Sequence, residues 1–275
     1  MRDAEGNQAT LDADHRRSVN EALAIIERDE DVKVVFAVES GSRAWGFASP
    51  DSDWDVRFLY ARPTRWFVQL EAGRDVIERA LPNDLDLAGW DMRKAINLAL
   101  KGNQALREWL SSPLVYTEDE TMADLLRRLV RSIPSRPAAI HHYASLARQV
   151  HERWLRRDEF PRKKYLYAIR PALTLRWLRS HAGEIPPMDL PSLLREVSLS
   201  SSEREAIGQL LREKAVNPEM GQGPAVPPLH ALIAHELEGV PAMVAAEPKQ
   251  EVPPQVRQDA QQLLVRSAAL ADQRR

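Results

Sequence analysis

The pattern of apolar and polar positions predicts a small set of strands in the first part of the chain. Residues 34–38 form an apolar run typical of a buried strand, and a second strand is expected over about 53–60, ending before Pro63. Polar and apolar positions alternate over 84–88, which predicts a third strand. Apolar residues at helical spacing over 18–28 predict an amphipathic helix ahead of these strands.

From residue 91 onward the pattern becomes helical. Segments with helical spacing are expected at about 91–101, 122–133, 138–156, 163–180, 191–196, 202–214 and 254–273. Two proline-rich stretches, near 217–228 and 247–254, are expected to be connectors. Early strands and late helices together predict an α+β fold, with a small mixed-sheet domain over 1–116 and an all-α domain over 117–275.

Composition narrows the class of protein. The 275 residues are 44% hydrophobic and 28% charged with a net charge of -2, which is typical of an ordinary globular protein and gives no sign of bulk nucleic-acid binding. The absence of cysteine excludes disulfides, cysteine-ligated zinc and thiol catalysis. Since neither a secretory leader nor a long apolar run is visible, we expect a cytoplasmic protein without membrane contact.

Candidate chemistry lies between the first two predicted strands. Gly41 and Ser42 directly follow the first strand, where glycine lets the backbone approach a phosphate and the following helix start attracts its charge. Side chains alternate across a strand, so Asp53 and Asp55 share one face and can reach one metal centre. Arg43 is a further candidate phosphate ligand.

A third carboxylate on a neighbouring strand would complete a site for two metal ions. Asp84 and Asp86 both qualify by position, and either arginine nearby, Arg43 or Arg57, is able to bind phosphate or to pair with an aspartate. Carboxylate oxygens suit magnesium, with manganese as an alternative. In this scheme Asp86 lies nearest the attacking hydroxyl and helps to remove its proton.

A basic helix face is the last candidate feature. Lys163, Tyr167 and Arg170 recur at spacings that place them on one side of a predicted helix. Cations beside an aromatic ring suit a triphosphate and a stacked base, whereas a solvated helix face is the simpler interpretation from these residues alone.

The residues over 39–46 (ESGSRAWG) and 49–58 (SPDSDWDVRF) resemble the DNA polymerase beta-type nucleotidyltransferase superfamily. Within it, they are similar to the predicted nucleotidyltransferases of the RNA-repair-associated group, RlaP type. Further segments similar to that group lie at 86–94, 103–116 and 163–171. The resemblance covers roughly residues 33–240 and favours Asp86 over Asp84 as the third carboxylate.

This resemblance implies a polymerase beta-like fold and transfer of a nucleoside monophosphate from a triphosphate to an acceptor hydroxyl, with release of pyrophosphate. The catalytic and metal-ligating residues that it implies are Asp53, Asp55 and Asp86, with two magnesium ions. The nucleotide-binding residues that it implies are Gly41, Ser42, Arg43, Lys163, Lys164, Tyr167 and Arg170. An RNA end is the first acceptor to consider. A protein or small-molecule acceptor and nucleotide binding without turnover remain alternatives, and the oligomeric state is left open.

Overall fold

The computed structural model describes residues 11–273 except 72, 82–84, 182 and 249–250. Its contacts divide the chain into two compact units. The sheet unit takes its described residues from Ala9–Gly41, Asp53–Pro134 and Gln250–Arg275, and the helical unit takes its described residues from Ser42–Ser52 and Ser135–Lys249. A five-stranded sheet and many helices make the fold α+β, as the sequence predicts.

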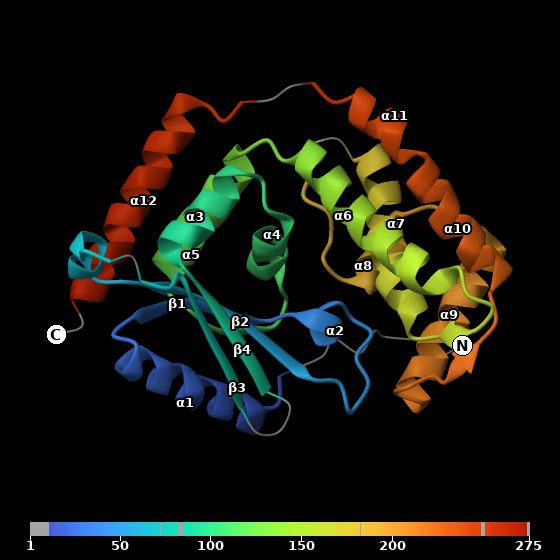
Figure 1. The fold of residues 1–275 in the computed structure, drawn as a ribbon, viewed down its shortest axis with the longest axis horizontal. Coiled ribbons are helices and arrows are strands. Elements are labelled where there is room, and N and C mark those ends of the chain that lie inside the picture. Colours follow the sequence, from blue (N-terminus) through green and yellow to red (C-terminus); the bar gives the residue numbers. More distant parts are fainter. Residues whose placement is uncertain (1–10, 72, 82–84, 182, 249–250, 274–275) are drawn as a thin grey trace. The chain divides into compact units, whose positions relative to one another are not determined.

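The sheet unit is built on five strands in the order β3-β4-β2-β1-β5 (Figure 1). The strands are β1 (Lys33–Glu39), β2 (Trp54–Ala61), β3 (Val76–Leu81), β4 (Leu85–Asp91) and β5 (Val115–Glu118). The β2–β4 pair is parallel, while β1–β2, β1–β5 and β3–β4 are antiparallel, so the sheet is mixed. The parallel pair brings the second and third predicted strands side by side.

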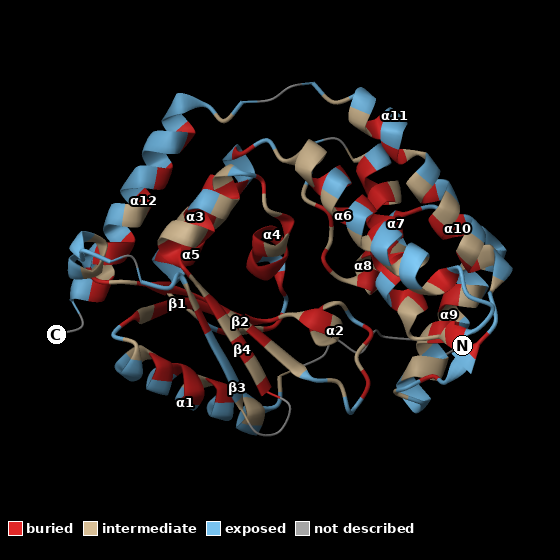
Figure 2. Cartoon of the chain, in the orientation of Figure 1, coloured by how far each residue is buried: buried red, intermediate tan, exposed pale blue. Residues whose placement is uncertain are grey.

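Helices cover both faces of this sheet. Helix α1 (Ala13–Asp29) packs on one face, where Phe58 and Tyr60 of β2 are buried. The other face holds Leu59 and Ala61, and its core includes apolar residues of four helices. These are α3 (Met92–Leu100), α4 (Gln104–Ser111), α5 (Glu120–Ser132) and α12 (Pro254–Asp272). The period of two along β2 therefore divides its side chains between two apolar layers, and Figure 2 shows buried residues along the central strands.

Helix α7 (Lys164–Ser180) is the central element of the helical unit. Apolar residues occur all round it, and buried positions such as Leu166, Ile169 and Leu173 belong to one core, as expected for a helix enclosed by others. The surrounding helices are α6 (Arg136–Val150), α8 (Leu190–Glu196), α9 (Ser201–Val216), α10 (Pro227–Glu238) and α11 (Val240–Ala245). The smaller elements of the chain are α2 (Gly41–Ala44), η1 (Thr64–Val68), the π-helical turn η2 (His151–Leu155), β6 (Phe160–Pro161) and β7 (Gln222–Gly223).

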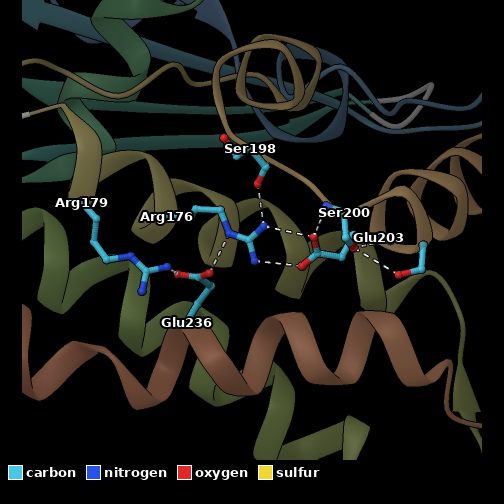
Figure 3. A network of polar contacts seen from close by, with 7 residues as sticks. Arg176, Arg179, Ser198, Ser200, Glu203 and Glu236 are labelled. Atoms are coloured by element: carbon cyan, nitrogen blue, oxygen red, sulfur yellow. Dashed lines mark hydrogen bonds and ion pairs between the residues drawn. The ribbon is translucent and has the colours of Figure 1, made fainter.

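A buried ion network joins three helices of this unit. Glu236 of α10 is 0% exposed and forms ion pairs with Arg176 and Arg179 of α7. Arg176 also pairs with Glu203 of α9 at 2.9 Å, and Figure 3 shows its guanidinium between the two glutamates. Ser200 and Glu203 form a capping box at the start of α9. The two arginines therefore compensate the buried negative charge of Glu236, which would strongly destabilise the fold if it were unpaired.

The compact units divide the chain differently from the predicted domains 1–116 and 117–275. Helices α5 and α12 lie beyond residue 116, yet they pack on the sheet because their apolar stripes face it. The stretches near 217–228 and 247–254 are connectors only in part. Pro227 and Pro228 open α10, and Pro254 opens α12, since proline is well tolerated in a first helical turn. Among the described residues, no helix is long and apolar enough to cross a membrane.

Candidate active site

Gly41 ends the sheet-unit segment that contains β1 and lies against the carboxylate of Asp55. Its φ is +62°, in the left-handed region that favours glycine. A Cβ added to Gly41 would lie 2.0 Å from Oδ2 of Asp55. The neighbouring Ser40 N–H donates to the carbonyl oxygen of Asp55 at 2.8 Å. Glycine is therefore needed here for both its backbone conformation and the space that it leaves.

The parallel pairing of β2 and β4 brings two of the predicted carboxylates together. Asp55 and Asp86 are direct partners in the register of these strands. Their side chains are 31% and 51% exposed, so both carboxylates reach solvent. Asp53 is exposed and lies just before β2, near enough to act electrostatically on Asp55. Asp84, the other candidate considered from the sequence, lies outside the described residues.

Arg57 joins the two paired carboxylates. Its Nη2 lies 3.0 Å from Oδ1 of Asp55, and its Nη1 lies 2.9 Å from Oδ2 of Asp86. Nη1 also donates to the carbonyl oxygens of Val56, at 3.0 Å, and Asp86, at 3.3 Å. The sequence left open whether Arg57 binds phosphate or pairs with an aspartate, and the structure shows Arg57 paired with aspartates.

Burial raises the pKa of the Asp55 carboxyl above its ordinary value. The neighbouring charges of Asp86 and Asp53 raise this pKa further, while Arg57 opposes the rise through its charge and its hydrogen bond. Three like charges held near one another favour a bound cation, because a cation relieves their mutual repulsion. The electrostatics therefore indicate a site that attracts positive charge.

Glu39, the last residue of β1, supports Asp55 from within the protein. It is 0% exposed, and its Oε1 accepts the backbone N–H of Asp55 at 2.9 Å. Its Oε2 accepts the hydroxyl of Tyr116 at 2.7 Å, and Ser112 Oγ donates to its carbonyl oxygen at 2.7 Å. Sequence reasoning missed this role. The only available signal was a carboxylate at the end of an otherwise apolar strand.

Ser42 and Arg43 fall in the helical unit, where they hold the loop after α2. The carbonyl oxygen of Ser42 accepts the N–H of Phe47 at 3.1 Å. Arg43 Nη2 donates to the carbonyl oxygen of Ser52 at 2.6 Å and to that of Pro50 at 3.4 Å. Arg43 therefore makes structural contacts within this loop, and its predicted contact with phosphate stays a prediction.

Two residues of the predicted basic helix face are engaged inside the helical unit. Arg170 is 3% exposed, lies over the ring of Trp45 at 4.4 Å and donates to the carbonyl oxygen of Met188 at 3.2 Å. Lys163 pairs with Glu219 at 2.6 Å. Such contacts fit a structural role for both side chains, and their nucleotide-binding role stays a prediction.

Lys164 and Tyr167 lie beside each other at the start of α7. Lys164 Nζ lies 5.3 Å from the ring centroid of Trp154 and 5.4 Å from that of Tyr167. Tyr167 is 39% exposed, and its ring meets Trp45 edge-on at 6.1 Å. These two predicted residues therefore place a cation beside an aromatic ring, an arrangement that suits a nucleotide.

The carboxylates suit magnesium by the chemistry of their donors. In the part of the chain that the structure describes, no three Asp, Glu or His side chains converge closely enough to hold a metal ion by themselves. Magnesium commonly takes only one or two protein carboxylates and completes its shell with water and substrate phosphate. Oδ2 of Asp55 and Oδ1 of Asp86 make no hydrogen bond among the described residues, so both oxygens remain for such a cation. The residues present therefore fit a hard divalent cation.

Comparisons with known proteins show the family of this chain. A profile of RlaP, an RNA repair pathway DNA polymerase beta family, matches residues 15–266. The uncharacterized protein YcgL of Bacillus subtilis (strain 168) is 39% identical over 225 residues, which are 82% of this chain and 86% of YcgL. The crystal structure of a nucleotidyltransferase-like protein from Exiguobacterium sibiricum 255-15 aligns with 83% of this chain and 75% of its own, at 14% identity and a TM-score of 0.30. Because the profile spans most of the chain, the protein belongs to the RlaP group, the RNA repair pathway DNA polymerase beta family.

Proposed function

We propose that this protein is a metal-dependent nucleotidyltransferase. It moves a nucleoside monophosphate from a nucleoside triphosphate to an acceptor hydroxyl and releases pyrophosphate. The observation that carries the proposal is the in-register pair of Asp55 and Asp86 beside Gly41, because it combines carboxylate oxygens on neighbouring strands with a glycine turn directly after β1. Membership of the polymerase beta family supports the same reaction class.

In the proposed reaction the acceptor oxygen attacks the α-phosphorus, a new phosphoester bond forms, and the bond to pyrophosphate breaks. Asp86, the more exposed of the paired carboxylates, accepts the proton of the hydroxyl. Asp53, Asp55 and Asp86 would hold magnesium, which neutralises phosphate charge and lowers the pKa of the hydroxyl. Glu39 fixes the backbone of Asp55 through its buried hydrogen bond and so orients this carboxylate.

The nucleotide is proposed to contact Gly41 and Ser42 through its phosphates. Lys164 and Tyr167 are the strongest candidates for the remaining contacts, because they place a cation beside an exposed aromatic ring. Arg43, Lys163 and Arg170 are weaker candidates, because the charged group of each already makes a hydrogen bond or an ion pair within the protein.

The proposed acceptor is an RNA end, supported by the family's description as part of an RNA repair pathway. A protein or small-molecule acceptor is the alternative, supported by the net charge of -2, because RNA binding rests largely on clustered cations that contact phosphates. The two differ in salt dependence, since binding of RNA weakens steeply as salt rises.

The test is incorporation from each α-labelled nucleoside triphosphate into RNA ends, proteins and small acceptors, with magnesium, with manganese and with a chelator. The expected result is metal-dependent label on one acceptor class and loss of that label in Asp55→Asn. A triphosphate that binds the protein yet never reacts with any acceptor would instead favour nucleotide binding without turnover.

A further inference from the structure

Arg57 occupies a position that the proposed reaction leaves unexplained. It lies two residues after Asp55 on β2, so both side chains leave the strand on the same face. The same guanidinium reaches Asp86 on the neighbouring strand β4. Both of its terminal nitrogens contact carboxylate oxygens, which leaves little of the group available to a phosphate.

We propose that Arg57 is a positioning residue that acts as the resting counter-ion of the carboxylate site. It offsets one of the two negative charges of Asp55 and Asp86 in the metal-free protein and holds one oxygen of each, so that Oδ2 of Asp55 and Oδ1 of Asp86 remain for a cation. The site therefore binds a divalent cation weakly by itself and gains affinity when a triphosphate supplies further oxygens. This inference rests on the proposed function only for the presence of a metal.

Backbone contacts also hold the guanidinium of Arg57 in place. The carbonyl oxygens of Val56 and Asp86 accept from Nη1, so the planar group is held by the backbone of both strands as well as by the carboxylates. Its side chain is 20% exposed. A guanidinium keeps its charge at any physiological pH, so this counter-ion is permanent.

Charge counting gives the direction of the effect. The carboxylates of Asp53, Asp55 and Asp86 contribute three negative charges, and Arg57 reduces their sum by one. Because Arg57 lies within ion-pair distance of two of these groups, its charge also repels an incoming cation at short range. Removal of Arg57 should therefore strengthen binding of a free metal ion, whereas a purely structural role predicts weaker or unchanged binding.

The experiment measures manganese binding to the metal-free full-length chain, without nucleotide, by the electron paramagnetic resonance signal of free manganese. Arg57→Met is expected to bind manganese at least about tenfold more tightly than the wild type. Arg79→Met is the matched control, because Arg79 lies on β3 of the same sheet and pairs with Glu30 rather than with the site. The control is expected to match the wild type.

Arg57→Lys provides a second variant in case Arg57→Met does not fold. A lysine ammonium lacks the planar fork that contacts two carboxylates at once, so tighter binding than in the wild type is again expected. Equal or weaker manganese binding by a folded Arg57 variant overturns the inference, and the proposed function then stands or falls on nucleotide transfer alone. Absence of manganese binding in every variant, together with absence of transfer, overturns the proposed function itself.

Discussion

Replacement of Gly41 by alanine should destabilise the protein through two separable effects. The first is conformational, because a non-glycine residue at φ +62° is in the left-handed region. The second is steric, because the new Cβ would lie 2.0 Å from Oδ2 and 2.8 Å from Cγ of Asp55. The new methyl group would therefore displace the carboxylate of Asp55, a proposed metal ligand.

The magnitude follows from these two effects. The left-handed conformation costs an alanine roughly 1–2 kcal/mol. Forcing an extra methyl group into a packed site costs about 1–3 kcal/mol more. Gly41→Ala should therefore lower the free energy of unfolding by roughly 2–5 kcal/mol. In an Asp55→Ala background the nearest remaining atom is Cβ at 3.2 Å, so only about the conformational cost should remain.

The assay is urea denaturation of the wild type, both single variants and the double variant. Gly221→Ala is the matched control, because Gly221 has a φ of +58° and nothing lies within 4 Å of an added Cβ. Its loss should equal the conformational cost alone, roughly 1–2 kcal/mol. The reasoning is refuted if Gly41→Ala costs no more than Gly221→Ala, or if its cost is the same with and without the Asp55 carboxylate.

Three further substitutions test the supporting structure. Glu236→Ala should lower the free energy of unfolding by about 3–5 kcal/mol, because two arginines lose a fully buried partner; the exposed Glu205→Ala should change it by less than about 0.5 kcal/mol in urea melts. Glu39→Gln should cost about 1–3 kcal/mol in the same assay, because one amide oxygen cannot replace two carboxylate acceptors, and an unchanged melt would contradict this. Burial, with a smaller contribution from His151, lowers the pKa of His230 below its usual 6.5. The contribution of His230 to folding stability is therefore present above pH 6.5 and is lost as the pH falls through the pKa of the folded state. In thermal melts from pH 6.5 downward, His230→Phe should lose less stability than the wild type. An equal loss in the two proteins would refute the role of His230.

Local sequence patterns were enough to predict the strands and the turn that carry the candidate site. The apolar run of β1, the glycine after it and the alternating aspartates around β2 are all encoded within a few residues of one another. The structure confirms these strands and the helix start at Gly41. The position of Asp86 beside Asp55 depends on strand register, which the sequence alone left open between Asp84 and Asp86.

Features that depend on distant parts of the chain were not predictable in the same way. Glu39 is a support for Asp55 only because Tyr116 and Ser112 arrive on later segments to complete its contacts. Helix α12 returns from the far end of the chain to cover the sheet, which no local pattern indicates. The pairing of Arg57 was one of two open interpretations, and it was settled by the parallel β2–β4 register.

The most direct test of the central claim is the rate of pyrophosphate release from a nucleoside triphosphate, with magnesium and the acceptor that takes up label, compared between Asp86→Asn and Asp75→Asn. Both aspartates have side chains that are 51% exposed, and each has one ion pair, with Arg57 and Lys94 respectively. Loss of a general base lowers a rate by about 100-fold or more, so Asp86→Asn should show at least that loss while Asp75→Asn keeps the wild-type rate. Equal rates in the two variants would contradict the assignment of nucleotidyl transfer to this carboxylate pair.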